Sequence, residues 1–190
     1  MLLLCILLST FALHVNGQAS CGSAIGGNRV ALRQLRSSTS DDAMISSSDA
    51  VVNIREELGY VQDSTPLGYV PMSDEDSVCN KQCLKQMYRM YNGHPGIQSH
   101  ITSIDRTEID AALATGFNFD GFGGSATIDG YCIPEQGCGA DVELLRFYKA
   151  EKQHRIMVGV QPGQNRATII QNYLDNGYIN EGTLCWIWST

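Results

Sequence analysis

The feature that most constrains the fold of this chain is an internal repeat. Residues 32–36, 88–92 and 145–149 read LRQLR, YRMYN and LRFYK, and share the pattern apolar-Arg-x-apolar-polar. Their arginines are 56 and then 57 positions apart, and a Gly-aromatic pair follows each arginine after 26, 27 and 31 positions. A chain with such a period consists of units that bury their apolar faces against one another.

The stretch between the two anchors predicts the same elements in every copy. A short apolar strand is followed by a helix, which in the second copy is capped by Ser103 and carries Ile109, Ala112 and Leu113 on one face. A glycine suited to a left-handed C-cap ends each helix, and an extended segment follows it. We therefore expect an α+β fold of three strand-strand-helix-strand repeats in a pseudo-threefold arrangement, with a β-rich core and outer helices. Closure into a barrel and three separate small sheets both fit the sequence.

The N-terminal residues predict a leader. Residues 1–17, MLLLCILLSTFALHVNG, form an apolar run without a charged side chain, and the run is too short to span a bilayer. This pattern indicates a secretory signal peptide, and an N-terminal membrane anchor is the alternative. Residues 18–29 then form an N-terminal segment, and residues 30–190 form a single domain with repeats at 30–71, 87–134 and 143–188.

The cysteines predict disulfides. Removal of the leader leaves six of the seven cysteines, and an even number in an oxidising compartment indicates three disulfides. Sequence alone leaves all pairings open, and we expect one pair, Cys21 with Cys185, to join the two ends of the chain. The motif Cys79-x-x-x-Cys83 lacks the second pair usual for zinc ligands, so we expect no metal and no cofactor. The six disulfide cysteines are Cys21, Cys79, Cys83, Cys132, Cys138 and Cys185.

The charge of the chain narrows its partners. With a formal net charge of −7, the chain lacks the basic surface that binds nucleic acid, and it is not attracted to anionic lipid. Together with the leader, this charge predicts a secreted, extracellular protein that binds neither nucleic acid nor, after cleavage, a membrane. Glycans and extracellular proteins remain as the two classes of partner.

The three copies resemble a family of secreted repeats of unassigned function. The family unit reads roughly Leu-Tyr-Arg-Leu-Tyr-Asn, then Asp-His-Phe-Tyr-Thr-Thr, then a helix, then Gly-Tyr-x-x-Glu-Gly-x-x-Gly-Tyr. The second copy matches it with YRMYN and SHITS, the third with LRFYK and GYINEG, and the first with LRQL and LGYV. The resemblance covers about residues 30 to 188 and implies a carbohydrate-associated protein, because such units accompany secreted hydrolases of glycans. The aromatic residues of the His-Phe-Tyr-Thr-Thr motif are missing from all three copies.

No motif in the chain predicts catalysis. The sequence has neither the Gly-x-Ser-x-Gly of a serine nucleophile nor the His-Glu-x-x-His of a metal helix. His100 and His154 hold matching places in their copies, which favours a structural role in hydrogen bonding at the strand ends. We therefore predict no catalytic residue.

The repeated arginines are more informative. Arg33, Arg89 and Arg146 point to the strand face opposite their apolar neighbours. We expect them to pair with a carboxylate such as Asp120 or Glu181 and so to fix each unit. The alternative is that they line three equivalent pockets.

Strand aromatics are the better candidates for ligand binding. Sugars stack on Tyr and Trp rings, while carboxylate and guanidinium groups bind the hydroxyls. Trp186 and Trp188 share one strand face by the period of two, so both are expected in the core or both exposed. The leading hypothesis is a non-enzymatic, lectin-like carbohydrate-binding domain. The alternatives are a structural or protein-interaction module without a small ligand, and a cryptic hydrolase. The candidate ligand-binding residues are Arg89, Tyr91, Asp120, Tyr131, Arg146, Tyr148, Glu181, Trp186 and Trp188.

Overall fold

The protein has a mixed fold in which strands predominate. The computed structural model describes residues 21–22, 27–75, 79–94, 98–121 and 127–190. Within these residues, three α-helices and eleven strands form an α+β fold with three antiparallel sheets, which confirms the predicted class. The predicted leader, residues 1–17, lies outside the described residues. No helix within the described ranges is long and apolar enough to cross a bilayer.

The elements fall into three consecutive units, each with one sheet and one α-helix. Unit 1 contains β1 (Arg29–Ser37), β2 (Ala43–Ser46), α1 (Asp49–Glu57), β3 (Tyr60–Gln62) and β4 (Gly68–Pro71). Unit 2 contains a 3-10 helix (Lys81–Cys83), β5 (Lys85–Asn92), β6 (Ser99–Ser103), α2 (Arg106–Ala114), β7 (Asn118–Phe119) and β8 (Thr127–Cys132). Unit 3 contains β9 (Val142–Lys149), β10 (His154–Val160), α3 (Arg166–Asp175) and β11 (Ile179–Ile187).

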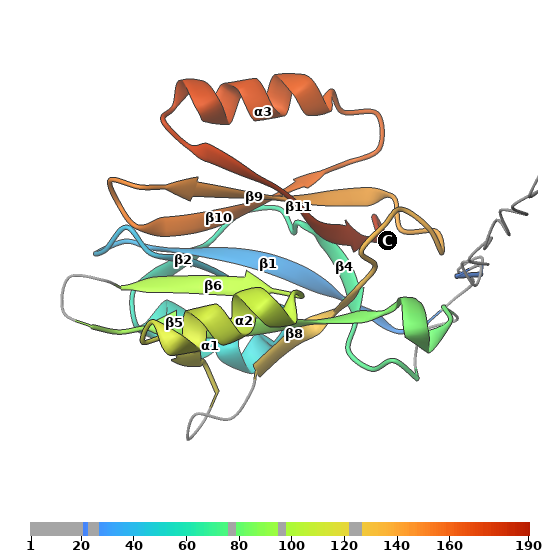
Figure 1. Ribbon diagram of the computed structural model, residues 1–190, viewed down its shortest axis with the longest axis horizontal. Coiled ribbons are helices and arrows are strands. Elements are labelled where there is room, and N and C mark those ends of the chain that lie inside the picture. Colours follow the sequence, from blue (N-terminus) through green and yellow to red (C-terminus); the bar gives the residue numbers. More distant parts are fainter. Residues whose placement is uncertain (1–20, 23–26, 76–78, 95–97, 122–126) are drawn as a thin grey trace, which may run out of the picture.

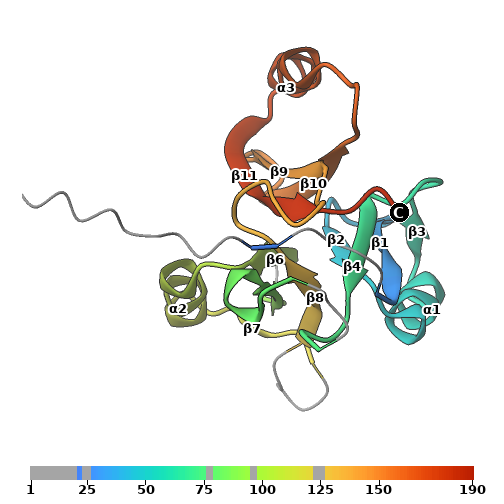
Figure 2. The ribbon, with the colours of Figure 1, turned by 90° about the vertical axis from the view of Figure 1, so that its right-hand side faces the viewer.

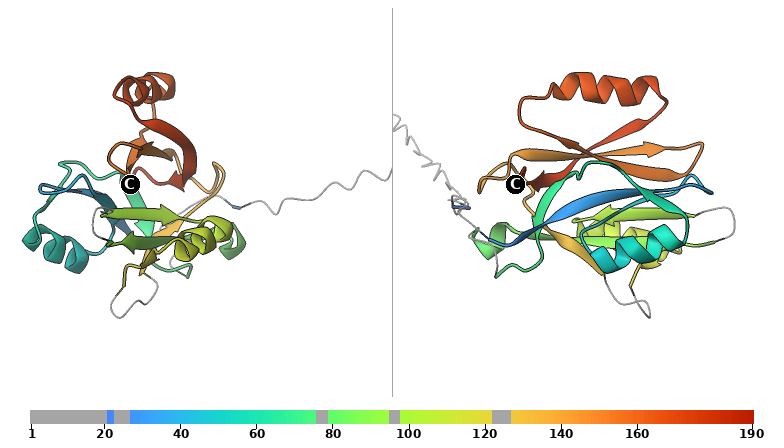
Figure 3. Two further views of the ribbon diagram at one scale, coloured as in Figure 1. Left: turned by 60° about the vertical axis from the view of Figure 1, so that its left-hand side comes forward. Right: turned by 180° about the vertical axis from the view of Figure 1, so that it is seen from behind.

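Each sheet is built around the strand that carries the repeated arginine. β1 lies between β2 and the returning strands β3 and β4, β5 lies between β6 and β7 with β8, and β9 lies between β10 and β11. The helices α1, α2 and α3 lie on the outside of the three sheets (Figure 2). Figure 3 shows them well separated from one another, each beside the sheet of its own unit.

The helix boundaries follow local chemistry. The N-caps are Ser48, Asp105 and Asn165, and each side chain accepts a hydrogen bond from a backbone N–H of the first turn. The prediction of Ser103 as the second N-cap is therefore wrong by two residues, and Ser103 instead accepts from the Asp105 N–H. The predicted C-terminal glycines are confirmed, because all three adopt a positive φ of 87°, 96° and 78°.

The units meet through two sets of strands. β2, β6 and β10 contact one another, and so do β4, β8 and β11 (Figure 1). The C-terminal tryptophans bridge the units, because Trp186 pairs with Ile133 and Trp188 pairs with Tyr69. Ile187 and Trp188 are buried in the apolar cluster shared by the units, which explains their apolar side chains.

The buried apolar residues described form one large cluster that the units share and three smaller local clusters. The largest cluster combines residues of all three units and includes Leu32, Met87, Leu144 and Trp188. Three smaller clusters lie mainly between the helix and the sheet of one unit, and Phe147 is central to that of unit 3. Each unit thus depends on its neighbours for most of its core.

The six described cysteines form three disulfides, as the cysteine number predicted, and the bond between Cys132 and Cys185 joins units 2 and 3. They pair Cys21 with Cys83, Cys79 with Cys138, and Cys132 with Cys185. The predicted pair of Cys21 with Cys185 is wrong, because the C-terminal strand β11 lies against unit 2 and places Cys185 beside Cys132. Loops of 53 to 62 residues are closed by these bonds. Loop-closure entropy of that size corresponds to about 4 kcal/mol per disulfide.

Candidate functional site

One carboxylate recurs at the same place in each unit. Asp63, Asp120 and Glu181 each lie four positions after the glycine that ends the helix of their unit. Each follows or belongs to the strand that returns beside the central strand. Each also accepts from at least two basic or amide side chains, as described below. The three positions are therefore compared one by one.

Asp120 lies in a dense cluster of charges. Arg89 Nε donates to Asp120 Oδ2 at 2.8 Å, and Arg55 Nη2 of α1 lies 2.9 Å from Oδ1. His100 Nε2 is 3.3 Å from Asp120 Oδ2 without an aligned hydrogen bond. Burial acts to raise the pKa of Asp120, but His100, Arg89 and Arg55 outweigh it and hold that pKa well below its usual range. The side chain keeps 15 % exposure.

Two further carboxylates complete this cluster. Asp42 accepts from the backbone N–H of His100 at 2.9 Å and lies 2.6 Å from its Nδ1. Arg89, itself only 1 % exposed, donates through Nη1 to Asp129 Oδ1 and to the Ile45 carbonyl of unit 1. Asp129 Oδ2 has no hydrogen-bond partner among the described residues. Burial raises the pKa of Asp129 to about 7, although Arg89 opposes the shift.

This pair of carboxylates does not make a hydrolase site. Asp120 and Asp129 share Arg89, and their pKa values are displaced in opposite directions. A hydrolase of glycosides needs both carboxyl groups beside the substrate. Asp129 is fully buried and lines none of the described pockets. The arrangement therefore joins units 1 and 2 and leaves only Asp120 in contact with solvent.

Glu181 is held by two arginines of unit 3. Arg146 Nε lies 2.8 Å from Glu181 Oε2, and Arg155 Nε lies 3.0 Å from the same oxygen. Arg146 also binds Glu108 of α2 and donates to the Thr102 carbonyl of unit 2. These contacts, with Arg89–Asp120, confirm the prediction that the repeated arginines pair with carboxylates. Arg33 follows the same rule through Asp49, at 2.7 Å.

Asp63 is the most open of the three acids. Arg36 Nε donates to its Oδ1 at 2.9 Å, and Gln34 Nε2 donates to its Oδ2 at 3.0 Å. Burial acts to raise the pKa of Asp63, but these partners outweigh it and lower that pKa below its usual value. The carboxylate keeps 34 % of its side chain exposed. The side-chain oxygen of the same glutamine, Gln34 Oε1, reaches unit 3, where it accepts from the Met157 N–H at 2.6 Å.

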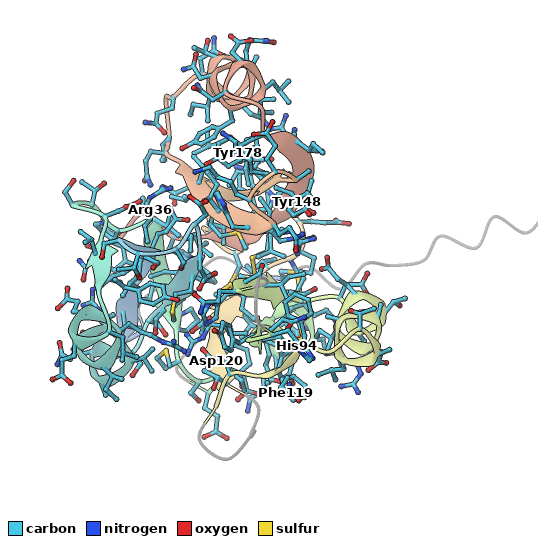
Figure 4. All side chains as sticks on the ribbon, turned by 90° about the vertical axis from the view of Figure 1, so that its left-hand side faces the viewer. Arg36, His94, Phe119, Asp120, Tyr148 and Tyr178 are labelled. Carbon is cyan, nitrogen blue, oxygen red and sulfur yellow. A yellow bond between two sulfur atoms is a disulfide. The ribbon has the colours of Figure 1, made fainter. Side chains whose placement is uncertain are left out.

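Each of these acids borders a different surface pocket. The pocket at Asp120 has a volume of about 380 Å³ and includes Tyr91, His94 and Phe119. The pocket at Asp63 has a volume of about 550 Å³ and lies between units 1 and 3. The pocket at Glu181 is smaller, about 250 Å³, and lies between units 2 and 3. Figure 4 shows Arg36 of the Asp63 pocket well apart from His94, Phe119 and Asp120.

The structure brings only some of the predicted ligand-binding residues together. Tyr91 and Asp120 share one pocket, and Arg146 and Glu181 share another. Arg89 is buried, and its described hydrogen bonds all go to other groups of the protein. The remaining predicted residues line none of the described pockets, and they are Tyr131, Tyr148, Trp186 and Trp188.

The two tryptophans differ in burial, although both pack against the apolar cluster shared by the three units. Trp188 is buried and donates from Nε1 to the Cys138 carbonyl, whereas Trp186 is only partly buried. The strand β11 ends at Ile187, so the alternation of faces does not continue to Trp188. The prediction that both are core or both are exposed is therefore wrong.

The two histidines also differ in position. His100 is opposite Tyr91 on the central strand, two residues after Arg89, whereas His154 is opposite Lys149, three residues after Arg146. Their places in the repeat are therefore offset by one residue, contrary to the prediction. Both rings are buried, and both hydrogen-bond to side chains at the strand ends, as expected.

The largest of the described pockets was not predicted. Its charged and amide side chains are those of Gln34, Arg36, Asp63, Gln161 and Gln164, and hydroxyl groups come from Thr65, Ser189 and two tyrosines. The signal for one of them was present in the sequence, because Asp63 follows its glycine by the same four positions as Asp120 and Glu181. Gln161 and Gln164 carry no such signal, since they reach the pocket only through the packing of unit 3 on unit 1. Among the described residues, no group of three or more His, Cys, Asp or Glu could hold a metal ion.

Comparison of the chain with protein-family models, with curated protein sequences and with solved structures gives no match.

Proposed function

We propose that this protein is a secreted, non-enzymatic carbohydrate-binding domain of lectin type. In this proposal its three units are copies of one repeat around a pseudo-threefold axis, and they belong to the secreted repeat family that their motifs resemble. The observation that carries the proposal is the recurrence of one carboxylate, four residues after the helix-ending glycine, at three separate surface pockets.

The chemistry of these pockets supports sugar binding. Carboxylate, amide and guanidinium groups with fixed directions bind hydroxyls, and nearby aromatic rings offer faces to the C–H groups of a sugar. Asp63 and Asp120 are fixed in this way, and Tyr173, Tyr91 and Phe119 border the same two pockets. Because the sites are small and open, the expected affinity for one sugar is weak.

Secretion is supported by independent features. The three disulfides are typical of an oxidising compartment, and residues 1–17 have the pattern of a signal peptide. We therefore expect the mature protein outside the cell, with glycans as its partners.

A glycan array of the oxidised protein tests the proposal, with reduced protein as the control for folding. Selective binding that is lost on reduction supports it. The variants Asp63→Asn, Asp120→Asn and Glu181→Gln should each weaken binding. Asp110→Asn, an exposed acid on α2 paired with Arg106, is the matched control and should bind normally. Absence of binding to every glycan, by protein whose fold is verified, would overturn the proposal.

A protein-interaction module is the second candidate. Ile54, Leu58 and Val61 of unit 1 are more than half exposed, which is unusual for apolar side chains of this size in one region. A blank array combined with loss of a protein partner on substitution of Leu58 by Ser would favour this second function.

A further inference from the structure

The pocket at Asp63 differs from the other two in ways that identify a ligand class. We propose that it binds a sugar carrying a 2-acetamido group, such as N-acetylglucosamine. This inference deepens the proposed function and rests on it. The volume, the charge, the hydrogen-bonding groups and the apolar wall of the pocket all favour such a sugar.

The volume of the pocket at Asp63 suits a small molecule. About 550 Å³ lies within the range of small-molecule sites, and it exceeds the volumes at Asp120 and Glu181. The backbone of β10 opens this space, because Gly159 has no side chain where β10 passes Leu67. A Cβ at Gly159 would lie 2.1 Å from the Leu67 carbonyl oxygen. The pocket is thus formed by a close approach of unit 3 to unit 1.

The charge of the pocket excludes two sugar classes. Arg36 and Asp63 are its only charged lining residues in the described chain, and they are paired with each other at 2.9 Å. The carboxylate of an acidic sugar would meet a guanidinium that Asp63 already neutralises. The ammonium group of an amino sugar would meet a carboxylate that Arg36 already neutralises. A neutral sugar is therefore the best match.

The hydrogen-bonding groups suit an amide. Asp63 Oδ1 accepts only from Arg36, so it keeps a lone pair for a further donor such as the N–H of an acetamido group. In the part of the lining that unit 3 supplies, Gln164 Oε1 accepts from the Gln161 N–H at 2.8 Å, which fixes its side chain. The amide N–H groups of Gln164 make no hydrogen bond among the described residues, so they are available to a ligand carbonyl.

An apolar wall completes the site. Pro66, Leu67, Met157 and Val158 line the pocket beside these polar groups. A plain hexose has no methyl group to place against such a wall, whereas the acetamido group carries one. Tyr173 of α3 borders the same space and is stacked on Phe147 with ring centroids 4.6 Å apart, which fixes the position of its ring.

Titrations of the oxidised protein test this assignment, observed by NMR of its backbone amides. The probes are N-acetylglucosamine, glucose, glucosamine and glucuronate. The acetamido sugar should bind about tenfold more tightly than glucose, the gain expected from one additional group in a matched pocket. Shifts should centre on Gly159, Gln161 and Gln164. Gln164→Ala should remove the preference, and Gln171→Ala, which changes an exposed glutamine on the helix α3 that follows Gln164, should keep it.

The possible outcomes separate this inference from the function on which it rests. Equal binding of glucose and N-acetylglucosamine, or a preference that survives in Gln164→Ala, would overturn the acetamido assignment while leaving a sugar-binding protein. Shifts confined to the pockets at Asp120 or Glu181 would also overturn it. Binding of no sugar by any of the three pockets would overturn the proposed function itself.

Discussion

Two interfaces of this protein place an acid in the same position and use it differently. At the contact of units 1 and 2, Asp120 is covered by Arg55 from the neighbouring helix and by Arg89 from its own strand. At the contact of units 3 and 1, the neighbouring helix presents Tyr173 four positions before its final glycine, where α1 presents Arg55. Asp63 therefore keeps a pocket of about 550 Å³ beside it.

The difference shows that the partners of one acid decide whether it becomes part of a buried ionic cluster or stays accessible at a pocket. A second arginine converts the carboxylate into part of a buried ionic cluster. A tyrosine leaves the carboxylate oriented but accessible. One residue on the neighbouring helix thus distinguishes the two interfaces.

The largest expected effect is on the buried cluster. Arg89→Met leaves Asp129 buried without a cationic partner, so we expect a loss of about 3–5 kcal/mol in the free energy of unfolding. Arg36→Met, which breaks the exposed pair with Asp63, should cost about 1 kcal/mol or less. Urea denaturation of both variants measures the contrast. Equal losses would contradict the distinction between the two interfaces.

A smaller effect is expected from closing the open interface. Gly159→Ala forces a Cβ against the Leu67 carbonyl and should cost about 1–3 kcal/mol, because neither backbone can move freely. Gly137→Ala is the control, since the nearest atom to its Cβ would be 3.9 Å away. Thermal unfolding compares the two. A stable Gly159→Ala protein that still binds sugar would show that the close approach is not needed.

The pH dependence of stability should have opposite signs for Asp129 in the buried cluster and for Asp63 at the open interface. The unfolded pKa of Asp129 is near 3.9 and its folded pKa is about 7, so its contribution to stability is lost as the pH rises between these values. Asp129→Asn mimics the neutral acid and should gain stability relative to the natural protein between pH 5 and pH 8. If the urea midpoints of Asp129→Asn and of the natural protein changed by the same amount between pH 5 and pH 8, this prediction would be contradicted.

Asp63 provides the matching control. Its folded pKa is lowered, so its contribution to stability is present above its unfolded pKa and is lost as the pH falls through the folded pKa. The difference in the free energy of unfolding between Asp63→Asn and the natural protein should therefore stay constant between pH 5 and pH 8.

The smallest effect on stability is expected where the two interfaces are exchanged. Tyr173→Arg gives α3 the residue that α1 has, so the new guanidinium should bind Asp63 and abolish sugar binding there. The loss of the Phe147 stack should cost about 0.5–1.5 kcal/mol. Amide NMR during sugar titration follows the binding. Unchanged binding in this variant would show that Tyr173 does not control access to the pocket.

The sequence predicted the local elements better than the contacts between units. The positions of the strands, the helix-ending glycines and the arginine–carboxylate pairs follow from spacing within one unit. The Cys21–Cys185 prediction failed because pairing depends on how β11 lies against unit 2, and no local pattern contains that information. The pocket at Asp63 was missed for the same reason, since Gln161 and Gln164 reach it from another unit.

The disulfide pairing has a consequence for proteolysis. The three bonds span residues 21–83, 79–138 and 132–185, so each span overlaps the next. A single cut of the backbone anywhere between Cys21 and Cys185 therefore crosses at least one intact bond, and the two pieces remain covalently joined. A nicked molecule would migrate as one species until its disulfides are reduced, and a protease would need at least two cuts to release a fragment from this part of the chain.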